Sequence, residues 1–148
     1  MLGHMQANIV ANAELVRKTA REQLGVDVGF DEAGVRWLDG FINRQRSAAR
    51  EEVIEKLPNT LGCFLGECIR HTFGGEWQQH EAGPMVTINE RLSVFPFNKV
   101  RKQLENEDGD SVLGLFTSIP PLLADVSQRR VATARLGQEG ERPWWRFW

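Results

Sequence analysis

The nine residues Leu61-Gly62-Cys63-Phe64-Leu65-Gly66-Glu67-Cys68-Ile69 decide the fold of this chain. Their apolar side chains surround most of the circumference of a helix, which is typical of a helix buried at the centre of a domain. The two glycines lie four residues apart on one helical face and leave room there for another backbone to approach closely. The segment therefore predicts a central helix around which the remaining elements pack.

The boundaries of this central helix are predicted from residues that interrupt or favour helices. Pro58 is expected to interrupt the charged stretch before it, so that Asn59 or Thr60 starts a new helix running to Thr72. Gly74-Gly75 is expected to end it.

Two amphipathic helices are predicted before the central one. The first covers residues 7–24 and ends at Gly25, and the second follows the N-cap Asp31 and runs to about Arg46. The apolar stripe of the first helix consists of Ile9, Ala13, Val16, Ala20 and Leu24.

Short extended segments follow the central helix. Residues 76–80, 84–89 and 92–95 are separated by turn-forming residues, which predicts a three-stranded antiparallel meander. Trp77 lies between polar neighbours in the first strand and is expected to point toward the helices. A further helix is predicted over residues 97–105.

The C-terminal part is predicted to be an interrupted helix followed by a tail. Asp110 is expected to cap a helix over residues 112–118, which Pro120-Pro121 breaks or restarts before a polar helix continues to Leu136. Helices on both sides of the strands in sequence favour an α+β fold, with several helices packed on a small three-stranded antiparallel sheet.

Size and composition indicate one domain. The chain has 148 residues, of which 41% are hydrophobic and 26% charged, and this mixture suits a single core. We predict one α+β domain over residues 7–123, followed by a C-terminal helix and aromatic tail over residues 124–148. Residues 1–6 resemble a cloning remnant.

Charge and cysteine usage limit the classes of partner. The net charge of −2 provides no positive field for nucleic acid, and no apolar run approaches the roughly 18 residues of a membrane span. Cys63 and Cys68 lie about 140° apart around the central helix, so we expect two buried free thiols. A cytoplasmic protein without nucleic-acid or membrane partners is therefore expected.

Four motifs carry a resemblance to a known family. They are the segment at residues 61–69, Gly74-Gly75-Glu76-Trp77, Val94-Phe95-Pro96-Phe97-Asn98-Lys99-Val100 and Asp110-Ser111-Val112. In this order they resemble a family of small bacterial proteins of unknown function, over about Val26 to Leu123. The family implies a fold and no activity. In size and class the chain also looks like the small α+β immunity proteins that bacteria encode beside secreted toxins.

One arrangement on the central helix is typical of nucleophilic catalysis. Cys63, Glu67 and His71 follow one another at intervals of four residues and so fall on one stripe. The thiol and the imidazole would lie about 12 Å apart along the axis, too far for a hydrogen bond. The interpretation that we favour is a buried cysteine and a helix-end ion pair between Glu67 and His71, with no catalytic residue.

Metal and cofactor chemistry have little support in the sequence. The candidate ligands Cys68, His71 and His80 lack the close ligand pairs of zinc sites, and the glycines follow no nucleotide-binding pattern. We expect no metal and no cofactor.

Two surface features are candidate partner-binding sites. The first is an acidic turn that would present negative charge to a basic partner and contains Glu105, Glu107, Asp108 and Asp110. The second is the aromatic tail, whose anchors would be Trp144, Trp145 and Trp148. For the tail, the interpretation that we favour is docking onto its own domain, followed by binding to a protein partner and then by binding to single-stranded nucleic acid. A homodimer is a further alternative.

These features favour a non-enzymatic interaction protein, best interpreted as an immunity protein that binds and neutralises a cognate bacterial toxin. The first alternative is a small-ligand-binding regulatory module, which an apolar cleft near Trp77 and Phe95 would favour and a filled sheet face would exclude. The second is an unrecognised enzyme that uses Cys63, Glu67, His71 or His80.

Overall fold

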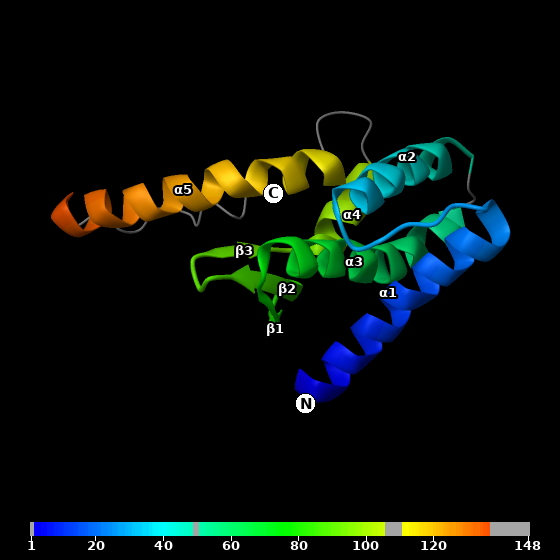
Figure 1. The fold of residues 1–148 in the computed structure, drawn as a ribbon, viewed down its shortest axis with the longest axis horizontal. Helices are drawn as coiled ribbons and strands as arrows, with labels where there is room; N and C mark the ends of the chain where they lie inside the picture. Colours follow the sequence, from blue (N-terminus) through cyan, green and yellow to red (C-terminus); the bar gives the residue numbers. More distant parts are fainter. Residues whose placement is uncertain (1, 49–50, 106–110, 137–148) are drawn as a thin grey trace.

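Five helices and a three-stranded antiparallel sheet make up the computed structural model, which describes residues 2–48, 51–105 and 111–136 (Figure 1). In chain order the elements are α1 (Leu2–Leu24), α2 (Glu32–Ala48), α3 (Glu51–Phe73), β1 (Glu76–His80), β2 (Gly83–Ile88), β3 (Leu92–Val94), α4 (Pro96–Glu105) and α5 (Val112–Leu136). The predicted α+β class is confirmed. Among the described helices, none combines the length and apolar character needed to cross a membrane.

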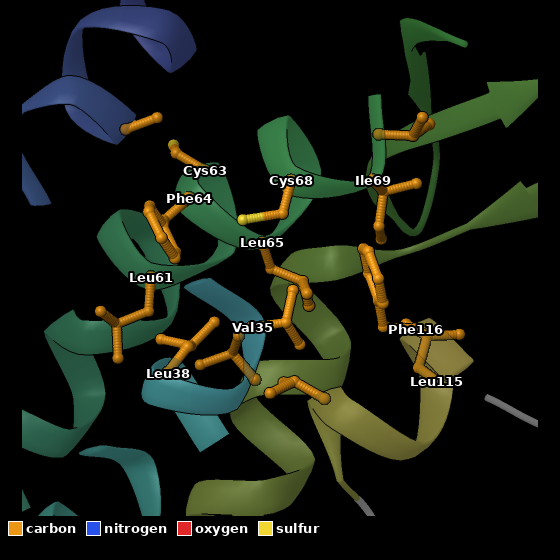
Figure 2. Close-up of a cluster of buried hydrophobic side chains, with 14 of the residues drawn as sticks. Val35, Leu38, Leu61, Cys63, Phe64, Leu65, Cys68, Ile69, Leu115 and Phe116 are labelled. Atoms are coloured by element: carbon orange, nitrogen blue, oxygen red, sulfur yellow. The ribbon is translucent and has the colours of Figure 1, made fainter. Parts of the chain in front are cut away.

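Helix α3 is the centre of the domain, as the sequence predicts. Every residue from Leu61 to Ile69 is buried, and α1, α2, α4 and β2 all contact this helix. Figure 2 shows the resulting core, in which Phe64 and Leu65 of α3 meet Val35 and Leu38 of α2.

The two glycines of α3 permit two close approaches. A Cβ atom at Gly62 would overlap the ring of Phe97 and lie 2.8 Å from its Cα, and one at Gly66 would overlap the indole of Trp77. Phe97 belongs to α4 and Trp77 to β1. The expected approach of another backbone is therefore confirmed at Gly62, where α4 crosses α3.

The sheet turns one apolar face toward the helices. In the order β1-β2-β3, Trp77 pairs with Val86, and Val86 in turn with Val94. All three residues are buried, which confirms the predicted orientation of Trp77. The three residues from Asn89 to Arg91 join β2 to β3; Asn89 and Glu90 adopt positive φ angles of 54° and 60°, and the Arg91 N–H donates to the carbonyl of Ile88 at 3.0 Å, which closes the turn.

Two helices begin earlier than the sequence predicts. Helix α3 begins at Glu51 and continues through Pro58, so the prediction of a new helix at Asn59 or Thr60 was wrong. A proline in a helix loses one backbone hydrogen bond, and here the ring is buried against the domain, which compensates for that loss. Helix α1 begins at Leu2 and places Met5 against the core.

Helix α5 also continues through its prolines. It runs from Val112 to Leu136 without the break predicted at Pro120-Pro121. Both prolines are exposed, whereas the apolar side of the helix is held in the core by Phe116 and Ile119. Burial of that side fixes the path of the helix in spite of the lost hydrogen bonds.

The start of α5 is fixed by a polar network. Ser111 occupies the N-cap, where its Oγ accepts the N–H of Gly114 at 3.2 Å and donates to Asp39 Oδ1 at 2.6 Å. The predicted cap, Asp110, lies outside the described residues. Gln103 of α4 is 1% exposed; its amide donates to Asp39 Oδ1 at 3.1 Å and accepts the N–H of Val112 at 2.8 Å. The network joins α2, α4 and α5.

Candidate functional site

Glu67 is a buried carboxylate that links α3 to the sheet. Its side chain is 1% exposed, and it accepts hydrogen bonds from Trp77 Nε1 at 2.8 Å and Arg70 Nε at 2.9 Å. His71 Nε2 lies 3.3 Å from its second oxygen, so the predicted contact between Glu67 and His71 is confirmed. The carboxylate is occupied by three partners from its own helix and strand β1.

The environment keeps Glu67 ionised. Burial acts to raise its pKa, but the hydrogen bonds from Arg70 and Trp77 and the nearby positive charges outweigh burial, so the pKa is lowered overall. A carboxylate held in this state is a poor general acid at neutral pH. Its role is to fix the Trp77 indole against α3, in the space left by the missing side chain of Gly66, which we call the notch at Gly66.

The two cysteines are buried thiols, as predicted, and they project from different sides of α3 (Figure 2). Burial raises the pKa of Cys63 to about 11, with a further contribution from the charge of Glu67. Burial likewise raises the pKa of Cys68, to which the charge of Asp31 adds. The thiolate is the nucleophilic form of cysteine, so neither residue is activated for catalysis.

The stripe of Cys63, Glu67 and His71 does not form a nucleophile and base. Cys63 Sγ donates to the carbonyl of Asn59 at 3.0 Å. His71 instead stacks on Phe30, with ring centroids 4.9 Å apart. The structure therefore separates the thiol from the imidazole and gives each a structural contact.

Cys63 and Cys68 are expected to resist alkylation in the folded protein. At pH 8 both remain almost fully protonated and out of contact with solvent, so iodoacetamide should modify neither residue within an hour under native conditions. Mass spectrometry should show both thiols modified in guanidinium chloride. Rapid modification of Cys63 in the native protein would contradict the structural role of this residue.

The candidate metal ligands point to separate places. Within residues 2–48, 51–105 and 111–136, no group of three His, Cys, Asp or Glu side chains is placed to hold a metal ion. Cys68 Sγ lies 4.0 Å from the carbonyl of Gly29, and His80 Nδ1 accepts the N–H of Ala82 at 3.0 Å in the β1–β2 turn.

The predicted partner-binding residues lie mostly outside the described part of the chain. Glu105 is exposed at the end of α4. The remaining members are not described and stay predictions: Glu107, Asp108, Asp110, Trp144, Trp145 and Trp148.

The face of the sheet predicted to hold a ligand is filled. Trp77 is 3% exposed and Phe95 7%. The Trp77 indole occupies the notch at Gly66 and packs edge-on against Phe97, with ring centroids 6.2 Å apart. This packing removes the observation on which the ligand-binding alternative depended.

An apolar groove lies between α1, α2 and α3, and we call it the α1–α2–α3 groove. Its volume is about 160 Å³, and its lining consists of Leu15, Val16, Thr19, Ala20, Leu24, Trp37, Phe41, Leu57, Thr60 and Leu61. Ten residues from three helices thus form a site without a charged side chain in its lining.

Large apolar side chains at the groove remain in contact with solvent. Leu15 is 52% exposed and Leu24 49%. Trp37 and Phe41 are half-buried, with ring centroids 5.3 Å apart, and Trp37 packs edge-on against Phe64 of the core. Trp37 therefore lies at the edge of the core and forms part of the groove lining.

The groove was missed in the sequence because three of its lining residues, Val16, Ala20 and Leu24, were assigned to the buried stripe of the first helix. Leu24 was placed on the buried stripe of α1, and this was wrong, since its side chain is 49% exposed and lines the groove. Leu15 lies outside the stripe altogether. A leucine at a polar position of an amphipathic helix is the signal that indicates such a groove.

The groove is thus a site in the described residues that is open to a partner, whereas the Glu67 cluster is occupied by the protein itself. No protein-family model, curated protein or solved structure matches the chain.

Proposed function

We propose that this protein is a non-enzymatic interaction protein of the cytoplasm, and that it acts as an immunity protein which binds and neutralises a cognate bacterial toxin. The observation that carries the proposal is the exposure of Leu15 and Leu24 beside Trp37 and Phe41 in the α1–α2–α3 groove. Aromatic and aliphatic side chains gathered in one exposed patch are typical of protein-binding surfaces.

The chemistry of the described residues supports binding over catalysis. The thiols of Cys63 and Cys68 are protonated, and Glu67 is held by three partners. The lining of the groove has two hydroxyl groups, those of Thr19 and Thr60, and no ionisable group. Such a site contributes affinity through burial of apolar surface and offers no group for acid or base catalysis.

The choice of a toxin as partner rests on the resemblance in size and fold class to immunity proteins. An inhibitor of this kind functions by covering a surface of its partner, for which an apolar patch provides affinity. The acidic turn that begins at Glu105 would contribute a separate, charged contact that steers association.

Leu15→Glu is expected to abolish recovery of the partner. The tagged protein would be purified from its native cells, and the products of adjacent genes would be quantified by mass spectrometry. Because a carboxylate in the groove must be desolvated when a partner covers it, recovery should fall by at least about tenfold. Since Leu15 is half-exposed, the variant should remain folded.

The matched control for this experiment is Ala7→Glu. Ala7 is exposed on the same helix and does not line the groove, so this variant adds the same charge elsewhere. It should recover the partner as the wild type does. Recovery of one adjacent gene product with wild-type protein and Ala7→Glu, but not with Leu15→Glu, is the expected result. Equal recovery with Leu15→Glu would refute the groove as the interface.

A further inference from the structure

We propose that the occupant of the α1–α2–α3 groove is an amphipathic helix of the partner, which inserts one large apolar side chain and flanks it with carboxylates. This inference rests on the proposed function, because it names the chemistry of the segment that an interaction protein of this kind would bind. Three properties of the groove support it: its volume, its length and the charge of its rim.

The volume limits what the groove can hold. At about 160 Å³ it is well below the roughly 300 Å³ at which pockets for cofactors and drug-sized ligands begin. Cavities of about 150 Å³ accept a single benzene ring. The groove therefore accommodates one aromatic or branched aliphatic side chain of a larger partner.

The length of the groove matches a helix. Its lining on α1 extends from Leu15 to Leu24, and nine steps of 1.5 Å give about 14 Å along that axis. A helix laid beside α1 would present about two and a half turns over this distance, which is enough for the one inserted side chain and for a further apolar residue about one turn to either side of it, lying along the groove. Trp37 and Phe41 of α2 form the opposite wall.

The rim of the groove is positively charged. Residues three or four positions from a lining residue on the same helix are its neighbours on the helix surface. Four exposed cations meet this condition, and they come from all three helices: Lys18, Arg21, Arg44 and Lys56. By the same condition the exposed acidic residue at the rim is Glu22, three positions after Thr19.

These cations are available to a partner. Within the described residues, none of the four forms an ion pair. The Arg44 guanidinium lies over Gly40, 3.2 Å from where a Cβ atom would be, and Gly40 is one turn from Trp37. Two other acidic residues of α1 and α2 are already paired with cations, Glu14 with Arg17 at 3.3 Å and Glu32 with Arg36 at 2.9 Å. Asp39 of α2 instead accepts hydrogen bonds from Gln103 and Ser111. Complementarity therefore favours carboxylates beside the apolar anchor of the partner.

The test uses two synthetic amphipathic helical peptides of about 18 residues. Both carry the same leucine ridge with one central phenylalanine, and the flanking positions are all glutamate in one peptide and all lysine in the other. Binding of each labelled peptide to the full chain is measured by fluorescence anisotropy at low and at high salt. The glutamate peptide should bind about tenfold more tightly than the lysine peptide at low salt, and the difference should shrink at high salt.

Two charge-reversed proteins complete the design. The combination of Lys18→Glu and Arg44→Glu should remove or invert the preference for the glutamate peptide. The combination of Arg36→Glu and Arg101→Glu makes the same change in net charge at exposed positions outside the lining and should leave the preference intact. Leu15→Glu should weaken binding of the glutamate peptide.

Each outcome bears on one proposal. Equal affinity for the two peptides, or no binding of either, would overturn the inference. Displacement of the peptide by dodecanoate would also overturn it, because the groove would then be a site for a small amphiphile. If Leu15→Glu still abolishes recovery of a native partner in that case, the proposed function stands without the inference. Preference for the glutamate peptide in a protein that recovers no partner would instead refute the proposed function and leave the chemistry of the groove in place.

Discussion

Glu67→Ala is expected to lower the free energy of unfolding by about 3 kcal/mol. The substitution removes a side chain that is 1% exposed and leaves the Trp77 N–H, which donates to it at 2.8 Å, without its acceptor in the core. Arg70 and His71 lose the same partner, but they are more exposed and can bond water. The contribution of Trp77 therefore accounts for most of the loss. Chemical denaturation of the wild type and of the variant measures this difference in the free energy of unfolding.

Two control variants and a measurement of the pH dependence separate the contribution of the hydrogen bond from that of the charge. Glu67→Gln keeps an oxygen for the Trp77 N–H and should cost about half as much. Glu76→Ala changes an exposed carboxylate of β1 and should have almost no effect. Because the pKa of Glu67 is lowered on folding, its ionised form stabilises the protein above its ordinary pKa, and this contribution is lost as the pH falls below that value. The difference between wild type and Glu67→Gln should therefore shrink in acid. If Glu67→Ala left the midpoint of chemical denaturation unchanged, this would contradict the role assigned to Glu67.

Gly62→Ala is expected to destabilise the fold by about 2 kcal/mol, although alanine is the better helix former. Its Cβ atom would lie 2.8 Å from the Phe97 Cα and overlap the ring, so α3 and α4 would have to move apart. The backbone at Phe97 cannot move away from the added methyl group as easily as a flexible side chain could. Thermal and chemical denaturation would both show the loss.

The matched control is Gly40→Ala on α2. A Cβ atom there would meet the end of the Arg44 side chain, which can move, so the gain in helix propensity should stabilise the protein by about 0.5 kcal/mol. The expected result is that the two glycine-to-alanine substitutions change the free energy of unfolding in opposite directions, Gly62→Ala lowering it and Gly40→Ala raising it. A stabilising effect of Gly62→Ala would show that α3 and α4 do not approach as closely as described.

The parts of the fold that could be predicted depend on local signals. Residues 61–69 are apolar around most of the helix, Glu67 being the exception, and burial at the centre follows from that pattern. The meander follows from short extended segments separated by turn residues, including Asn89, which adopts a positive φ angle at small cost. The prolines gave wrong boundaries because burial of Pro58 and of the apolar side of α5 outweighs the hydrogen bonds that prolines remove.

The candidate site could not be predicted in the same way. Whether a leucine on α1 is covered depends on where α1 crosses α3, and that crossing is a property of the packed domain rather than of the helix itself. Val16 is 6% exposed, while its neighbour Leu15 is 52% exposed. The structural role of Glu67 could be predicted as far as its contact with His71, because the two are one helical turn apart. Its bond to Trp77 depends on the notch at Gly66 and on the position of β1.

Helix α3 contains Pro58, Gly62 and Gly66, which together make it about 5 kcal/mol less favourable as an isolated helix than the same length of alanine. Its helical state therefore depends on neighbours that come from both earlier and later parts of the chain: α1 before it, and α4 and β1 after it. No contiguous fragment shorter than residues 2–105 contains all of these neighbours. The domain should consequently fold and unfold as one cooperative unit, with no autonomous subdomain from which its structure could be built in stages.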